Sequence, residues 1–88
     1  MNKERRETIA RLSKRFYALQ EELEDIRFEI ENVKGEEQEY FDNMPENFQV
    51  SDRGVSAESA VDALEQAHDA LYDLLNSDVV GLLETAQA

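Results

Sequence analysis

The first residues that could do chemistry lie near the N-terminus, where cations are interleaved with aromatic rings. Arg11, Lys14 and Arg15 precede Tyr17, and Tyr17 lies about one helical turn after Lys14. Such a cluster can hold a nucleotide, because a cation pairs with phosphate while a ring stacks on the base. The alternative is that these cations pair with carboxylates near the other end of the chain. Those carboxylates belong to Asp73, Asp78 and Glu84.

A second polar cluster surrounds the only proline. Its candidate ligand-binding residues are Tyr40, Asn43, Asn47 and Arg53. Three aromatic rings in this stretch indicate a packed segment, and an arginine among them can bind an anion. Arg53 either pairs with Asp42 or Glu46, or contacts an anionic ligand in a pocket between protomers.

The only histidine, His68, follows Glu65 with two residues between them. Glu-x-x-His is half of the ligand set of carboxylate-bridged di-iron bundles. The spacing also arises easily by chance in a Glu-rich chain. We therefore expect His68 to lie in a helical seam, bonded to a carboxylate or the backbone, and we predict no metal site and no cofactor.

Two acid pairs, Glu21 with Glu24 and Glu39 with Asp42, are similar to the magnesium-binding pairs of all-α nucleotide pyrophosphatases. Both pairs lie in one predicted helix, ~27 Å apart at 1.5 Å per residue, so they cannot share an ion within one chain. The sequence also has no cysteine, no Gly-rich phosphate loop and no nucleophile motif. We predict that the protein is not an enzyme and has no catalytic residues.

Charge is distributed unevenly along the chain. The net charge is −12, yet the first 15 residues carry +4. Phosphates would be repelled by the acidic body, which argues against direct DNA binding. An acidic band over residues 21–46 instead raises the alternative of a decoy, or DNA mimic, that binds a host protein. No apolar run reaches the ~18 residues needed to span a bilayer, so we expect no membrane partner.

These residues must be positioned by helices, because the apolar residues of the first half follow a heptad. The heptad positions are Ile9, Leu12, Phe16, Leu19, Leu23, Ile26, Ile30 and Val33. The pattern predicts a helix over about residues 4–43, which Pro45 would end because a proline disfavours helical geometry in the residue before it.

The second half repeats this helical organisation after a loop. Proline and glycine place the loop at 44–56, with Ser56 as the N-cap of a helix over about 57–76. A kink or break is expected near Ser77, followed by a helical segment over about 78–85. The predicted seam of this half contains Val61, Leu64, His68, Leu71, Leu75 and Leu82. Alanines at 60, 63, 67 and 70 widen its apolar face.

One loop between two long helices predicts an all-α antiparallel hairpin, with residues 1–88 as a single domain. The apolar faces are wider than a two-helix hairpin can cover, so we expect a homo-oligomeric bundle. The predicted interface residues are Phe16, Leu19, Leu23, Ile26, Ile30, Leu64, Leu71 and Leu75.

Residues 36–49 and 51–54 contain a Glu-rich stretch, Asp-Asn-x-Pro-Glu and Ser-x-Arg-Gly. Together with the Ala/Leu/Asp helix that follows, this arrangement resembles short proteins of tailed bacteriophages, over about residues 20–75. The resemblance implies a phage origin and a fold, not a reaction. We expect the protein in the cytoplasm of an infected bacterial host.

By analogy with small helical phage proteins that inhibit host defence, we expect a non-enzymatic oligomer that sequesters a nucleotide-type signal. The alternative partner is a host defence protein, bound by the acidic band. An all-α pyrophosphatase or a metal-binding bundle is the third reading.

Overall fold

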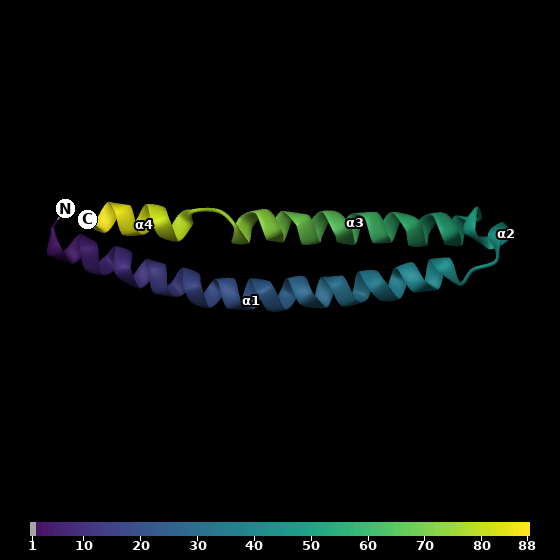
Figure 1. The fold of residues 1–88 in the computed structure, drawn as a ribbon, viewed down its shortest axis with the longest axis horizontal. Coiled ribbons are helices and arrows are strands. Elements are labelled where there is room, and N and C mark those ends of the chain that lie inside the picture. Colours follow the sequence, from purple (N-terminus) through teal and green to yellow (C-terminus); the bar gives the residue numbers. More distant parts are fainter. Residues whose placement is uncertain (1) are drawn as a thin grey trace.

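The computed structural model describes residues 2–88, and over that range it contains helices and no strands. The long helix α1 (Lys3–Asp42) is followed by a single turn, α2 (Glu46–Gln49). The chain then returns through α3 (Asp52–Leu75) and α4 (Val79–Gln87). Figure 1 shows α3 and α4 running back along α1, with both termini at one end. The predicted antiparallel hairpin is therefore confirmed.

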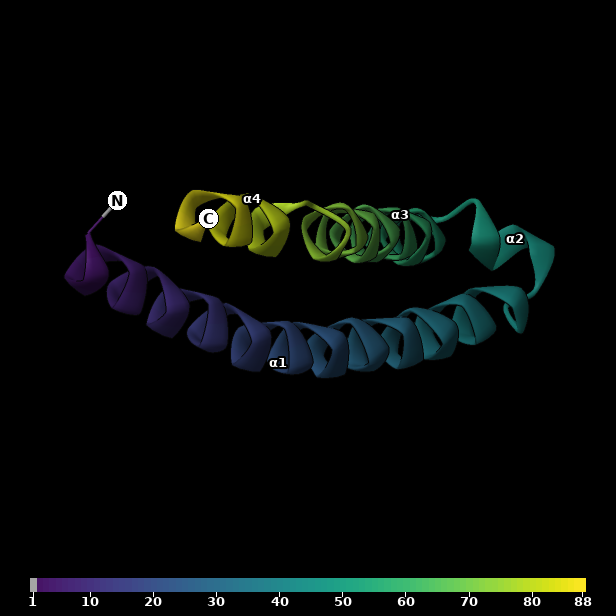
Figure 2. The ribbon, with the colours of Figure 1, turned by 60° about the vertical axis from the view of Figure 1, so that its left-hand side comes forward.

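The hairpin is a rod rather than a globule. Its principal extents are 67 × 15 × 14 Å and its radius of gyration is 20.0 Å. A compact chain of this length would have a radius of gyration of ~12 Å. Figure 2 shows that α1 is bowed, with its concave side toward α3 and α4. A rod two helices thick has no interior in which a large side chain can be covered from every direction.

Both ends of α1 follow from local chemistry. The side chain of Asn2 accepts a hydrogen bond from the backbone N–H of Arg5 at 2.8 Å, which satisfies one of the free donors at the start of a helix. The helix ends at Asp42, close to the predicted residue 43, three residues before Pro45. Gly35 is inside the helix and has open space where a side chain would be.

The turn is shorter than the predicted loop 44–56. The structure places α2 within this segment, and α3 begins at Asp52, so Ser56 lies inside the helix and is not its N-cap. Glycine is typical of turns and Gly54 lies in the predicted loop, but its φ is not positive. A Cβ at Gly54 would collide with the backbone of Phe48 and Gln49. Glycine is needed here for close packing of α3 on the turn.

The break near Ser77 is confirmed. Asn76 ends α3, and its side-chain amide donates to the carbonyl of Tyr72 at 2.9 Å. The helix resumes at Val79 and continues to Gln87, two residues beyond the predicted end. The interruption changes the helical phase, so the prediction that Leu82 belongs to the seam is wrong. Leu82 is exposed and Leu83 is half-buried instead.

On α3 the remaining seam matches the prediction. On α1 only half of the predicted heptad faces α3. One row of residues belongs to the predicted heptad and also faces α3. It consists of Phe16, Leu23 and Ile30, all half-buried. The second row facing α3, here called the polar row, consists of Ser13, Gln20, Arg27 and Lys34. The predicted heptad positions left exposed are Leu12, Leu19, Ile26 and Val33. Together with the exposed Tyr40, which follows Val33 at the same seven-residue spacing, they are here called the apolar row.

The buried core of one chain is small. Over residues 2–88 the buried hydrophobic residues are Ala57 and Val61, and no large side chain is fully buried. The hydroxyl of Ser13 is buried without a hydrogen-bond partner. Apolar burial is the main source of folding free energy, so a single hairpin has little of it to offset chain entropy.

Candidate functional site

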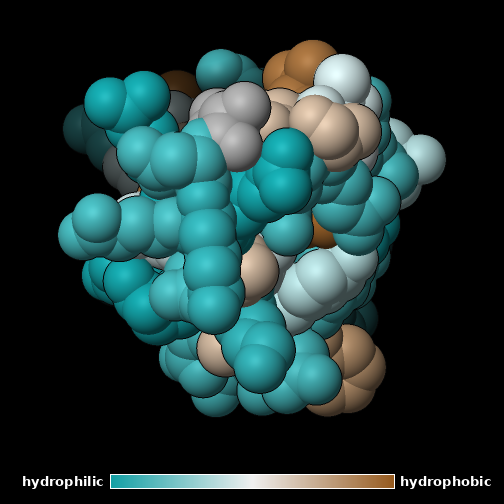
Figure 3. Space-filling view, turned by 90° about the vertical axis from the view of Figure 1, so that its left-hand side faces the viewer, coloured by the Kyte–Doolittle hydropathy of each residue, from teal (hydrophilic) through white to brown (hydrophobic). Residues whose placement is uncertain are grey.

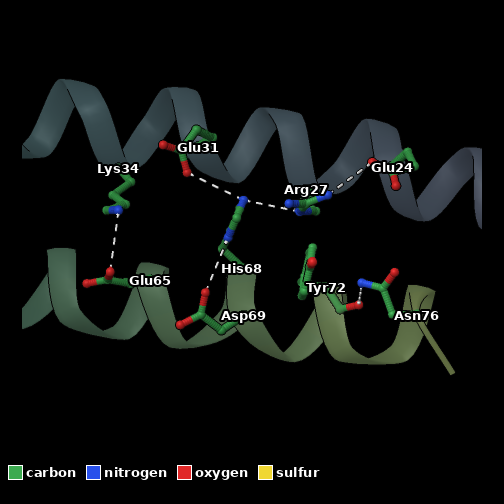
Figure 4. Close-up of polar contacts among 9 residues, drawn as sticks. All are labelled: Glu24, Arg27, Glu31, Lys34, Glu65, His68, Asp69, Tyr72 and Asn76. Carbon is green, nitrogen blue, oxygen red and sulfur yellow. Dashed lines mark hydrogen bonds and ion pairs between the residues drawn. The ribbon is translucent and has the colours of Figure 1, made fainter.

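Polar side chains of α1 and α3 contact one another along one side of the hairpin (Figure 4). Nε of Arg27 donates to Nε2 of His68 at 3.2 Å. Carboxylates of Glu31 and Asp69 lie 3.5 Å from Nε2 and Nδ1 of His68, respectively. His68 therefore lies in the predicted seam. Its hydrogen bond across the seam is to Arg27, whereas the prediction was a bond to a carboxylate or to the backbone.

Arg27 is also part of a second contact. Its guanidinium carbon lies 4.8 Å from the centre of the Tyr72 ring, within the range of a cation–π interaction. Together with Tyr17, Glu24 and Asn76, Arg27 and Tyr72 line an open groove of about 390 Å³. Glu24 lies 3.5 Å from the Arg27 guanidinium. With its cation already engaged and carboxylates on the rim, this groove is poorly suited to an anion.

A different groove lies at the turn, here called the turn groove. It measures about 340 Å³ and is lined by Tyr40, Asn43, Met44, Pro45, Phe48 and Arg53. The structure therefore brings together three of the four ligand-binding residues predicted in this segment, and Asn47 is not among the lining residues. Among residues 2–88 Arg53 forms no ion pair, so the alternative that it pairs with Asp42 or Glu46 is not seen.

The predicted cluster near the N-terminus is not assembled. Arg15 lines a groove with Leu12, Phe16 and Leu19, whereas Tyr17 lines the groove beside Tyr72 on the other side of the hairpin. Arg11 donates to the hydroxyl of Thr8 at 3.1 Å, and Lys14 is exposed.

Nor do these N-terminal cations pair with Asp73, Asp78 or Glu84 within the described chain. Figure 3 looks onto the end that carries both termini and shows a mostly hydrophilic surface. Arg11, Lys14 and Arg15 are exposed there, and neither predicted arrangement of the cluster is formed.

The candidate metal-binding residues are separated or already paired. Glu65 lies 3.9 Å from Nζ of Lys34, and the Asp42 carboxylate accepts from Gln38 at 2.9 Å. Between residues 2 and 88, no three carboxylate or imidazole side chains form a group that could hold a metal ion. Over the same residues, none of the helices combines the length and apolar character needed to cross a bilayer.

The predicted oligomer interface is divided between two environments. Six of its residues lie half-buried between helices of the same chain: Phe16, Leu23, Ile30, Leu64, Leu71 and Leu75. Leu19 and Ile26 belong to the apolar row and are 50% and 36% exposed. In one chain, these two are therefore the most exposed of the predicted interface residues.

The contact of Arg27 with Tyr72 and His68 was not anticipated from the sequence. It follows from the pairing register that the folded hairpin sets, in which Lys34 meets Glu65. In an antiparallel pair, each step back along α1 corresponds to one step forward along α3. Counting seven residues from each brings Arg27 opposite Tyr72.

Comparisons with known protein families, characterised proteins and solved structures gave no match to this chain. The geometry of its own residues therefore carries the functional argument.

Proposed function

We propose that this chain is a non-enzymatic binding protein that sequesters a small anionic ligand of the nucleotide type in the turn groove. The observation that supports this most directly is the placement of Arg53. Its guanidinium has no acidic partner within residues 2–88, and it shares an open groove with the rings of Tyr40 and Phe48. A guanidinium binds phosphate oxygens through paired hydrogen bonds, and aromatic rings stack on bases.

The charge of the chain narrows the ligand class. A net charge of −12 repels polyanions, so each additional phosphate charge weakens binding. A cyclic nucleotide carries one negative charge per phosphate and presents a flat base. The Asn43 amide, which both donates and accepts, can read the edge of that base. We therefore propose a cyclic nucleotide rather than a nucleoside triphosphate as the ligand.

Calorimetry with a panel of cyclic nucleotides and nucleoside triphosphates tests the proposal. We expect cyclic nucleotides to bind more tightly than triphosphates, and Arg53→Gln to abolish binding. Tyr40→Leu should weaken binding by ~1–3 kcal/mol through the loss of one stacking platform. Arg11→Gln, at the opposite end of the rod, is the matched control and should bind normally. No binding by any nucleotide at high micromolar concentration would end this proposal.

The biological setting that we propose is antagonism of a bacterial host's antiviral defence. It is supported by the resemblance of the Glu-rich helix and the turn to tailed-bacteriophage proteins. Sequestering a signal needs no turnover, which agrees with a proposed site made of one cation, one amide and aromatic rings. A defence system activated by a cyclic nucleotide should be silenced by expression of the chain and should recover when Arg53→Gln replaces it.

A second candidate function is supported by the outer side of α1. Phe28 is 68% exposed there and shares a shallow depression with Glu22, Asp25, Glu29 and Asn32. An aromatic ring surrounded by carboxylates can anchor on a basic protein surface, as a decoy requires. This reading predicts recovery of a host protein from lysate at low salt, with loss at high salt and loss in Phe28→Ala. Recovery that is unchanged by salt would count against it.

A further inference from the structure

The apolar row of α1 and the alanines of α3 lie on the same side of the hairpin. The opposite, polar side is fixed by contacts: Glu31 meets His68, Lys34 meets Glu65, and one groove is lined by both α1 and α3. Successive residues of a helix are rotated by 100°, so each helix has one flank on either side of the residues that form its seam. Since the polar flanks meet on one side, the other two flanks share the other side.

These remaining flanks are uncharged along most of their length. On α3 the flank, here called the small row, consists of Ala60, Ala63, Ala67, Ala70 and Leu74. On α1 it is the apolar row, in which Leu19 and Val33 are each 50% exposed. Exposed branched side chains that recur every seven residues along a helix are typical of a packing surface rather than of a solvated one.

We propose that a second copy of this chain packs on this face, so that two hairpins form a four-helix bundle. The face presents large side chains on one helix and small side chains on the other, so two copies related by a two-fold axis are complementary in shape. The apolar row runs from residue 12 to residue 40, ~42 Å at 1.5 Å per residue, on a rod 15 Å wide. The face therefore has a projected area on the order of 600 Å² per copy, comparable to the ~800 Å² per partner of a standard interface.

The orientation follows from the residues beside each row. The outer neighbours of the apolar row on α1 include Glu22, Glu29 and Glu36, so packing α1 on its own copy would bring like charges together. On α3 the small row carries no charge, and Ser56 and Ser77, which lie beyond its two ends, are uncharged as well. The apolar row of one copy therefore packs on the small row of the other.

This orientation places both turns at the same end of the bundle. Tyr40 ends the apolar row, and Arg53 lies one heptad before Ala60, so both belong to this face and to the turn groove. In the dimer, Tyr40 of each copy lies next to the small-row end of the other. The second copy therefore narrows the groove in which we place the ligand, although the dimer itself does not depend on that ligand.

Light scattering gives the first test. We expect the mass of two chains at micromolar concentration, twice the 10.1 kDa of one chain. A mass of one chain, with full helical circular dichroism, would overturn the proposal. Because nucleotide binding is measured separately, a monomer that still binds a nucleotide would reject the dimer and not the proposed function.

Cysteine cross-linking gives the second test, since the chain has no cysteine of its own. Val33→Cys and Ala67→Cys chains are refolded as a mixture and oxidised after their circular dichroism is checked. We expect mixed disulfide dimers of Val33→Cys with Ala67→Cys, and little dimer from Val33→Cys alone. Phe28→Cys, on the outer side, is the matched control and should not cross-link to Ala67→Cys. Efficient cross-linking of Val33→Cys to itself would overturn the assigned packing.

Discussion

Two rows of α1 flank the same three residues, Phe16, Leu23 and Ile30, and they have opposite chemistry. The polar row lies against α3, where Arg27 and Lys34 contact side chains of that helix. The apolar row faces away from α3 and remains exposed in one chain. A single chain therefore covers its less hydrophobic row, which is the reverse of what burial alone would select.

The difference teaches that the two rows have separate tasks. Hydrogen bonds and ion pairs depend on alignment, so the polar row fixes which residues of α1 and α3 are opposite each other. Dispersion and apolar burial depend on area, so in the proposed dimer the apolar row would supply the free energy of association. In the dimer that we propose, the polar row aligns the two helices of each hairpin and the apolar row joins the two hairpins.

The largest expected effect comes from placing a charge in the apolar row. Ile26→Asp would bury an unpaired carboxylate in the dimer, at a cost of several kcal/mol. We expect an unfolded or monomeric chain, measured by circular dichroism and light scattering. Phe28→Asp, two residues away on the outer side, is the matched control and should remain a folded dimer.

If the protein functioned as a single hairpin, the Ile26→Asp and Phe28→Asp variants would behave alike. Ile26 is already 36% exposed in one chain, so its aspartate would reach solvent and cost little. Equal stability of the two variants, with equal mass, would show that the apolar row is only a solvated surface.

The second prediction concerns the turn that brings the polar row onto α3. A methyl group at Gly54 would collide with the backbone of Phe48 and Gln49 and displace the start of α3. We expect Gly54→Ala to lower the free energy of unfolding by ~1–3 kcal/mol in urea denaturation. Gly35→Ala is the matched control, because its side chain meets open space. It should raise stability by up to ~1 kcal/mol through helix propensity.

The third prediction isolates the polar row. Arg27→Ala removes a hydrogen bond to His68 and a cation–π contact with Tyr72, and we expect a loss of ~1–2 kcal/mol. The mass should stay that of a dimer, since the apolar row is untouched. Tyr72→Phe keeps the ring and should be close to neutral, whereas Tyr72→Leu should lose the cation–π part. A change from dimer to monomer in Arg27→Ala would contradict the division of tasks.

Much of the fold was predictable because it depends on local rules. The heptad, Pro45 and the polar residues 76–78 predicted α1, its end and the break before α4. The assignment of rows was not predictable from the pattern. Apolar spacing identifies the wide face of a helix, but it does not tell which part of that face meets the same chain and which part stays free.

The candidate site was predicted only in part, because some of its residues are close in sequence and others meet only through the fold. Tyr40, Asn43 and Arg53 meet because they lie on either side of one short turn. The N-terminal cluster was misjudged because rotation by 100° per residue separates Arg15 from Tyr17, although they are neighbours in sequence. Arg27 and Tyr72 depend on the pairing register of two distant segments, which only the folded hairpin fixes.

The smallest expected effect belongs to the ion pair at the edge of the polar row. Lys34 and Glu65 lie 3.9 Å apart, and their side chains are 25% and 56% exposed, so water and salt screen them. We expect Glu65→Gln to lower the free energy of unfolding by less than ~0.5 kcal/mol, and less still at high salt. Glu58→Gln, one heptad earlier on the same flank, is the matched control, since Glu58 has no ion pair in residues 2–88.

A double-mutant cycle with Lys34→Met measures the coupling between Lys34 and Glu65 directly. A coupling above ~1 kcal/mol would mean that the polar row stabilises the hairpin through charge as well as alignment, and the contrast with the apolar row would have to be drawn less sharply.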